Sequence, residues 1–306
     1  MERSVSHLPI MRVAGTAPGT ACEDALAVEE PLEIQLGYER KGWRVHKSVS
    51  ITMRTPGADA ELAAGFLFSE GIIADAAQIE SVRAESDNVV RVELRPGVPV
   101  DLQRLERHFY TTSSCGVCGK TSLAAVQTTS HKTRPTTVEG PFLDAATIHR
   151  LPAIQRERQA VFDQTGGLHA AALFDGEGRF LCQREDVGRH NAVDKLVGSQ
   201  LLGGAPLPLS GRVLFVSGRA SFELVQKAVA AGIPFMAAVG APSSLAVELA
   251  NAFGITLLGF VRGERFNIYS GAARVRFSDE DRTSTPPPTG ESETHGHPVP
   301  GSLLFS

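Results

Sequence analysis

The folded part of this chain begins with segments in which apolar and polar residues alternate. Residues 32–36 and 45–53 both alternate with period two, the pattern of half-buried antiparallel strands. Asp59 is placed to cap a helix that runs to Gly71. With a further strand at residues 89–94, these elements predict a small α+β unit.

The pattern of apolar residues changes in the second half of the chain. Short continuous apolar runs occupy residues 213–216, 235–239 and 255–261. Two helical stretches, 221–231 and 245–253, separate these runs, and each stretch ends at a glycine. Strands that are apolar throughout and alternate with helices predict parallel pairing, with helices on both faces of the sheet.

The segment before these runs predicts a hairpin and a helix. Residues 168–174 and 180–183 read as two strands around a glycine-rich turn. Residues 187–202 carry an apolar stripe at helical spacing, and Asp186 is placed to cap that helix. We therefore expect an α/β fold with two domains. The expected domains are a smaller α+β domain over residues 29–108 and an α/β domain over residues 122–278.

Candidate ligand-binding residues follow the three apolar runs. In open α/β sheets, ligands bind outside the carboxyl ends of the strands. Backbone amides, serine hydroxyls and arginine side chains at these ends suit phosphate oxygens. The alternative, that glycine and serine turn the chain and the arginines are solvated, is equally open from spacing alone. No P-loop and no G-x-G-x-x-G fingerprint occurs. The candidate residues are Ser217, Gly218, Arg219, Ser243, Ser244, Arg262, Gly263, Glu264 and Arg265.

Residues 185–195 are dense in polar side chains at a predicted helix start. Such groups are costly to bury unless they are paired. Arg189, His190 and Asn191 therefore suit either ligand binding or a network that holds the helix start in place. His169 lies in an apolar strand, where a histidine is more often a core residue than a ligand.

Composition and charge restrict the class of protein. The chain has 306 residues, 42% of them hydrophobic, and a net charge of −4, which gives no reason to expect nucleic acid as a partner. No apolar run approaches twenty residues, so we expect no membrane span and a cytoplasmic location. Residues 1–28 and the proline-rich residues 279–306 lack periodicity. We expect both segments to be flexible and exclude them from the fold.

The closely spaced cysteines Cys115 and Cys118 lie in a predicted mobile loop, residues 109–121, rich in serine and glycine. A structural zinc ion requires four ligands, and no second Cys-x-x-Cys is present. The zinc deaminase signature is also missing. A thioredoxin-type redox pair would follow the first strand of a βαβ unit, whereas Cys115 and Cys118 lie between the two predicted domains. Redox exchange is therefore the less favoured interpretation. A sulfur relay needs an accessible thiolate on a mobile loop, which this segment can supply, with Lys120 lowering the thiol pKa.

Several long motifs then occur in order, and together they resemble the formate dehydrogenase accessory sulfurtransferases, the FdhD family. The resemblance extends from about residue 29 to residue 270. The motifs lie at residues 54–57, 61–73, 112–120, 167–174, 184–195, 217–227, 241–249 and 259–265.

The resemblance implies a function and a set of roles. Family members take persulfide sulfur from a cysteine desulfurase and pass it to the molybdenum bis(molybdopterin guanine dinucleotide) cofactor, for formate dehydrogenase. Cys115 would carry the persulfide with Cys118 as its partner, and Phe260, Val261 and the following residues to Arg265 would contact the cofactor. The resemblance also implies a cytidine-deaminase-like C-terminal domain without metal, and a homodimer. A non-catalytic cofactor chaperone remains the alternative, and a structural zinc module a weaker one.

Overall fold

The computed structural model describes residues 4–101 and 140–277. The chain divides into two compact units, Met1–Arg276 and Phe277–Ser306, and all the elements described below belong to the first unit. Cys115, Cys118 and the predicted loop at residues 109–121 lie outside the described residues, as does the proline-rich segment at 279–306.

The first sheet has four strands in the order β4-β3-β6-β5. The predicted antiparallel pairing of β3 with β4 is confirmed, and β3 also pairs with β6 in parallel. One face of the sheet packs against helix α1, because alternate strand residues such as Leu32, Ile34 and Val92 are buried there. The elements are β3 (Glu30–Arg40), β4 (Trp43–Arg54), α1 (Asp59–Ser69), a 3-10 turn (Ala76–Gln78), β5 (Ile79–Ser86) and β6 (Val89–Leu94).

The second sheet has six strands in the order β13-β12-β11-β10-β8-β9. Its centre, β10-β11-β12, is parallel as predicted. The pairs β10-β8, β8-β9 and β12-β13 are antiparallel, so the sheet is mixed. The strands are β8 (His169–Phe174), β9 (Phe180–Asp186), β10 (Val213–Val216), β11 (Phe235–Ala238), β12 (Thr256–Arg262) and β13 (Arg265–Ser270).

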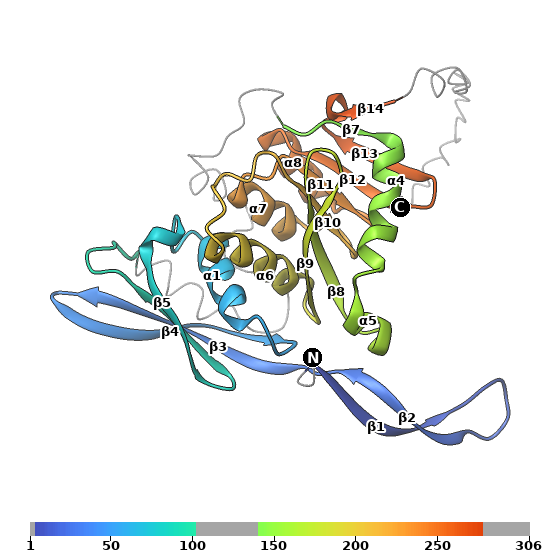
Figure 1. Ribbon diagram of the computed structural model, residues 1–306, viewed down its shortest axis with the longest axis horizontal. Coiled ribbons are helices and arrows are strands. Elements are labelled where there is room, and N and C mark those ends of the chain that lie inside the picture. The colour runs from blue at the N-terminus through green and yellow to red at the C-terminus, as the bar shows by residue number, and fades with distance from the viewer. Residues whose placement is uncertain (1–3, 102–139, 278–306) are drawn as a thin grey trace, which may run out of the picture. The chain divides into compact units, whose positions relative to one another are not determined.

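Helices cover both faces of the six-stranded sheet, as the continuous apolar strands require. Buried residues of α6, α7 and α8 pack on one face, and Ile148 and Leu151 of α4 pack on the other; Figure 1 shows α4 and α6 on opposite sides. The elements are β7 (Leu143–Asp144), α4 (Ala145–Arg156), α5 (Ala160–Thr165), α6 (Arg189–Leu202), α7 (Phe222–Ala231), α8 (Ser244–Phe253), a 3-10 turn (Ala272–Arg274) and β14 (Val275–Arg276).

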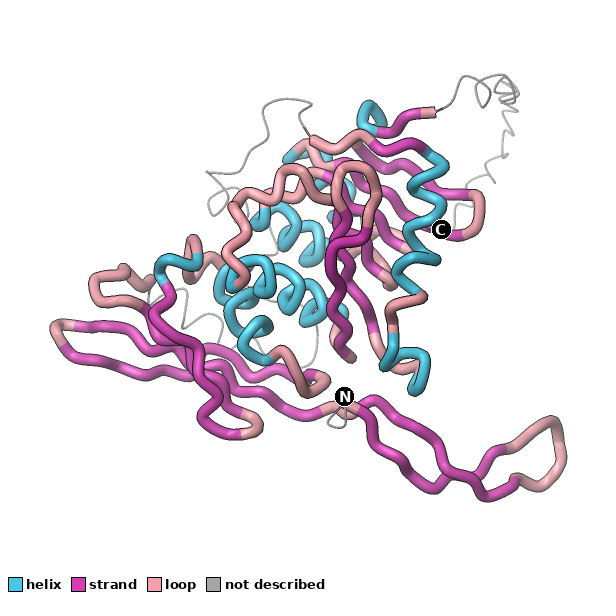
Figure 2. The backbone as a smooth tube through the Cα atoms, in the orientation of Figure 1, coloured by secondary structure: helices cyan, strands magenta, loops and turns pink. Residues whose placement is uncertain are grey.

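One buried core extends across both sheets, and a second core fills the α4 side of the six-stranded sheet. Helices α1 and α6 lie between the strands of the two sheets (Figure 2). Gly65 of α1 and Gly198 of α6 let the two helices approach closely, because each faces the backbone of the other helix. A Cβ on Gly65 would lie 1.9 Å from the Asp194 carbonyl oxygen, and one on Gly198 would lie 1.8 Å from the Glu61 carbonyl oxygen. The described parts of the two predicted domains therefore belong to a single compact unit.

The N-terminal segment, predicted to lack regular structure, forms an antiparallel hairpin. Strand β1 (Val5–Arg12) pairs with β2 (Thr20–Ala27) at every position. The base of the hairpin is held where Val28 N donates to Ser4 O and the Ser4 hydroxyl donates to Pro56 O. A two-stranded hairpin is marginal in isolation, and this one packs against α5, a contact that no local pattern reveals.

Two predicted helix caps have different roles in the structure. Helix α6 begins after Gly188, and Asp186 does not cap the helix backbone but pairs with Lys195, Oδ2 to Nζ 2.7 Å. Asp59 is the first residue of α1, preceded by Ala58 in the left-handed conformation, and it pairs with Arg54. Both carboxylates therefore pair with buried cations, and neither helix has a side-chain capping hydrogen bond.

Candidate functional site

The ends of the three parallel strands lie side by side at one edge of the six-stranded sheet. Val239 N donates to Val216 O, Gly240 N to Gly218 O at 2.9 Å, and Phe260 N to Gly240 O at 3.1 Å. The ladder thus continues beyond the assigned strands. Glycine at position 240 allows this close approach, because a Cβ there would lie 3.0 Å from Gly218 O and from the Arg219 Cα. The sequence-predicted strand ends therefore meet at one place.

Three helices begin at the same edge. Strand β9 runs in the same direction as β10, so α6, α7 and α8 all start where these strands end. The Ser243 hydroxyl caps α8 by accepting from Ala246 N at 3.3 Å, and Ser221 precedes α7. Helix N-termini expose backbone N–H groups and carry partial positive charge. The edge is therefore electrostatically suited to anions.

The segment from Phe260 to Arg265 forms the tip of the β12-β13 hairpin. Phe260 adopts a left-handed conformation, φ 55°, at an irregularity in the strand pairing. The Arg262 guanidinium lies 5.5 Å from the Phe260 ring centroid, and Arg262, Gly263, Glu264 and Arg265 are exposed. The Val261 side chain is fully buried in the core on the α4 side of the sheet, which leaves only its backbone for contact with a ligand.

Two histidines and an arginine join this edge: Arg189 and His190, for which the sequence left ligand binding and a structural network open, and His169, which the sequence favoured as a core residue. His169 begins β8, and a Cβ on Gly218 would lie 3.2 Å from its Nδ1. Burial, followed by the charges of Arg189 and His190, lowers the pKa of His169, which favours the neutral imidazole. The Arg189 Nε is buried without a hydrogen-bond partner among the described residues. His169 is thus half-buried at the strand edge, not in the core.

His190 links the starts of α6 and α7. Its Nε2 lies 3.3 Å from the Ser221 hydroxyl and 3.8 Å from Glu223 Oε2. The neighbouring imidazole lowers the pKa of Glu223 to about 2 and keeps a carboxylate beside His190. His190 is therefore a hydrogen-bonding side chain at the edge of the anion-suited site, held beside the Glu223 carboxylate.

The polar residues Asn191 and Lys195 in the segment 185–195 have a structural role. Asn191 is buried and donates to Met53 O at 2.8 Å and to Asp186 Oδ1 at 3.1 Å. Lys195 donates to Thr55 O at 2.7 Å in addition to its pair with Asp186. The segment therefore separates into buried residues that join α6 to β4 and the edge residues Arg189 and His190.

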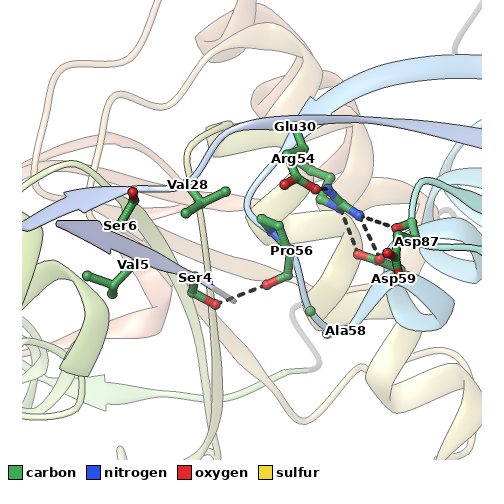
Figure 3. Close-up of a pocket in the computed structure, with 11 residues that line it drawn as sticks. Ser4, Val5, Ser6, Val28, Glu30, Arg54, Pro56, Ala58, Asp59 and Asp87 are labelled. Carbon is green, nitrogen blue, oxygen red and sulfur yellow. Dashed lines mark hydrogen bonds and ion pairs between the residues drawn. The ribbon is translucent and has the colours of Figure 1, made fainter. Parts of the chain in front are cut away.

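A hollow of about 710 Å³ lies beside the start of α1 and is lined by Glu30, Arg54 and Asp59 among others (Figure 3). Arg54 is 1% exposed and donates to both carboxylate oxygens of Asp59, to Asn88 and to the Asp87 carbonyl. Nη1 donates to Glu30 Oε2 at 3.3 Å, so each of the three guanidinium nitrogens has a partner. We therefore assign Arg54 to holding β4, α1 and the β5-β6 turn together, not to ligand binding.

The described ranges contain neither a metal-ligand cluster nor a membrane-spanning helix. Across residues 4–101 and 140–277, no three His, Cys, Asp or Glu side chains are grouped so as to hold a metal ion. No helix in these ranges has the length and apolar character needed to span a membrane. Cys22 and Cys182 are free thiols, and burial raises the pKa of Cys182.

Comparison with known proteins places the chain in a family. The model of the FdhD/NarQ family matches residues 27–276, and the chain belongs to this family. It is 51% identical to the sulfur carrier protein FdhD of Streptomyces avermitilis over 90% of this chain and 97% of that protein. It is 48% identical to the protein of the same name from Mycobacterium tuberculosis, over 90% and 98%.

A solved structure shares the fold. The crystal structure of a putative formate dehydrogenase accessory protein from Desulfotalea psychrophila superposes with a TM-score of 0.66, at 24% identity, over 89% of this chain and 99% of that one. The mixed α/β architecture with parallel strands is thereby confirmed. The finer similarity to cytidine deaminase stays a prediction.

Proposed function

We propose that this chain is a sulfurtransferase for the molybdenum cofactor of formate dehydrogenase. It accepts sulfur as a persulfide on Cys115 from a cysteine desulfurase. It then passes the sulfur to the bis(molybdopterin guanine dinucleotide) cofactor bound at the strand ends. We further propose that it acts in the cytoplasm as a homodimer.

The observation that carries this proposal is the anion-suited strand edge in a chain of the FdhD/NarQ family. The relatives that match over most of their length are named sulfur carrier proteins. A nucleotide-bearing cofactor supplies phosphates that helix N-termini and arginine side chains bind well. Ser217, Gly218, Arg219, Ser243 and Ser244 supply the polar groups of that edge.

The sulfur step uses ordinary thiolate chemistry. The Cys115 thiolate attacks the outer sulfur of the donor persulfide, which bonds to Cys115 while the donor cysteine leaves as a thiolate. Attack by the Cys118 thiolate on the Cys115 sulfur of the resulting persulfide releases hydrosulfide and leaves a Cys115–Cys118 disulfide. Two cysteines at this spacing can therefore both load and release one sulfur.

Mass spectrometry tests the loading step. After incubation with a cysteine desulfurase and cysteine, the peptide that contains Cys115 is expected to gain the mass of one sulfur atom, which a reductant removes. The peptide with Cys182 serves as the internal control, because burial raises the pKa of that thiol. Labelling of Cys182 alone, or of neither peptide, would contradict the proposal.

The exposed arginines of the β12-β13 hairpin tip test the placement of the cofactor. Replacing Arg262 and Arg265 together by alanine is expected to weaken binding of guanosine diphosphate by about tenfold, because charge-assisted contacts to phosphate are lost. Isothermal calorimetry measures the affinity. Arg83→Ala on the four-stranded sheet is the control, since Arg83 is also exposed. Unchanged affinity in the double variant would show that the phosphates do not bind at this hairpin tip.

A further inference from the structure

The turn that joins β3 to β4 lies beyond the core of the four-stranded sheet. The paired ends of the two strands project away from the helices (Figure 1). Arg40 pairs with Trp43 across the turn, and Tyr38 pairs with Val45 one step nearer the core. Residues two apart on a strand share a face, so Arg40 and Trp43 lie on the same face as Tyr38. The core covers that face at Tyr38, which is 3% exposed, but not at Trp43, which is 78% exposed.

Contacts to the neighbouring strand brace this β3-β4 tip. Arg44 Nε donates to Glu93 Oε2 at 2.8 Å, and Arg44 Nη1 donates to the Leu94 carbonyl oxygen of β6 at 2.7 Å. Lys41 and Gly42 take φ values of 51° and 80°, the left-handed pair that a tight two-residue hairpin turn requires. The tip is therefore held in place, and none of these contacts requires an aromatic side chain there.

A smaller hollow, of about 290 Å³, lies beside the β3-β4 tip. Its walls include Tyr38, Arg40, Lys41 and the stretch 97–100 that follows β6, and Glu39 is the one carboxylate among them. Arg40 and Lys41 are exposed and form no salt bridge within the described part of the chain. The chain as a whole carries a net charge of −4, so the tip is a local cationic site on an acidic protein. Complementary charge on a partner would therefore be negative.

The β3-β4 tip also lies where the chain leaves the described fold in the direction of the paired cysteines. Val100 lines the hollow, and Asp101 is the last residue described before residue 140. Cys115 follows Asp101 by 14 residues, a length of chain that reaches at most about 50 Å. A partner seated on the tip is thus within range of Cys115.

We propose that the β3-β4 tip, residues 40–43 with the hollow beside them, is the docking surface for the protein that donates sulfur to Cys115. Trp43 is the apolar anchor, since tryptophan and arginine are enriched among the residues that carry binding energy at interfaces. The donor supplies a recess for the indole ring and carboxylates for Arg40 and Lys41. A projecting ring beside a hollow fits a contoured protein surface better than a flat bilayer. The assignment rests on the proposed function, in which the donor is a cysteine desulfurase.

Fluorine NMR tests the contact directly. Trp43 is the one tryptophan of the chain, so the full-length protein labelled with 5-fluorotryptophan gives a single fluorine resonance. Unlabelled cysteine desulfurase, added without cysteine so that no sulfur moves, is expected to shift or broaden that resonance because the exposed ring becomes buried. A resonance that stays unchanged at desulfurase concentrations sufficient to load Cys115 would overturn the docking surface.

The dependence of Cys115 loading on desulfurase concentration tests the individual side chains. Trp43→Ala is expected to raise the concentration that gives half the maximal loading rate by about tenfold, and Arg40→Glu by about threefold or more. The maximal rate and the melting temperature are expected to stay unchanged, because both side chains are exposed and lie outside the core. Leu181→Ala on β9 and Arg150→Glu on α4 are the matched controls, since both residues are exposed and lie on other elements.

Other occupants of the β3-β4 tip give different results. Conversion of a dimer to a monomer by Trp43→Ala in analytical ultracentrifugation would make the tip an interface between two copies of this chain. Cosedimentation with phosphatidylglycerol vesicles that Trp43→Ala abolishes would assign it to a membrane, and either result would overturn the donor assignment. Normal loading with the wild-type concentration dependence in both tip variants would overturn docking alone. Absence of loading in the wild-type protein would contradict the proposed function, while the fluorine resonance would still decide docking.

Discussion

Replacing Cys115 by alanine is expected to abolish activation of formate dehydrogenase. In a host that lacks its own family member, the variant is expected to give no more formate dehydrogenase activity than an empty vector, because the nucleophile that holds the sulfur is gone. The measurement is formate oxidation in extracts at matched levels of the accessory protein. The residue lies outside the described part of the chain, so no packing contact enters this expectation.

The matched variant is Cys182→Ala, which removes a half-buried thiol from β9. This change is expected to leave activation near the wild-type level. Full activation by Cys115→Ala would instead favour the non-catalytic chaperone, in which the cysteines only position the cofactor. Loss of activity in both variants, with normal amounts of folded protein, would contradict the assignment of the sulfur to Cys115.

Replacing Lys195 by methionine is expected to lower the free energy of unfolding by about 3–5 kcal/mol, because it leaves the buried Asp186 carboxylate without its cation. Asp186 has no exposed surface and Lys195 has 3%, and the ammonium also donates to Thr55 O. The substitution therefore weakens the junction between α6 and the end of β4. Urea unfolding followed by circular dichroism measures the change.

Two comparisons sharpen this test. Adding Asp186→Asn to Lys195→Met is expected to recover part of the loss, since a neutral amide no longer needs the cation. Arg12→Met removes the cation of an exposed pair with Asp24 and is expected to cost less than about 0.5 kcal/mol. A loss for Lys195→Met as small as that for Arg12→Met would show that the buried pair does not stabilise the junction.

Strands and helices that depend on residues close in sequence were predictable from the pattern of apolar and polar residues. Strands β3 and β6 alternate because one face is buried, and β10, β11 and β12 are apolar throughout because helices cover both faces. In β4 the alternation has no such cause, since Ile51 and Met53 are 51% and 48% exposed. Helices α7 and α8 end at glycines that take positive φ, as their sequence positions indicate. The β1-β2 hairpin was not predictable in this way, because its support comes from α5 and from Pro56.

The candidate site was predictable only in part, for a related reason. Ser217, Gly218 and Arg219 follow an apolar strand, and a parallel sheet brings such ends together. His169 carries no such positional signal. Its place at this edge depends on β8, a strand that runs antiparallel to β10.

The sequence alone was sufficient to recognise the family motifs, the paired cysteines and the parallel strands. Each of these depends on residues that are close in sequence or on the spacing of apolar residues. The packing of distant segments settled which polar residues are structural. It turned Asp186, Asn191 and Lys195 inward and left Arg189 and His190 at the edge. The physical reason is that the cost of burying a charge depends on its partners, and one partner of Asp186, the Thr55 backbone N–H, lies 131 residues away in the chain.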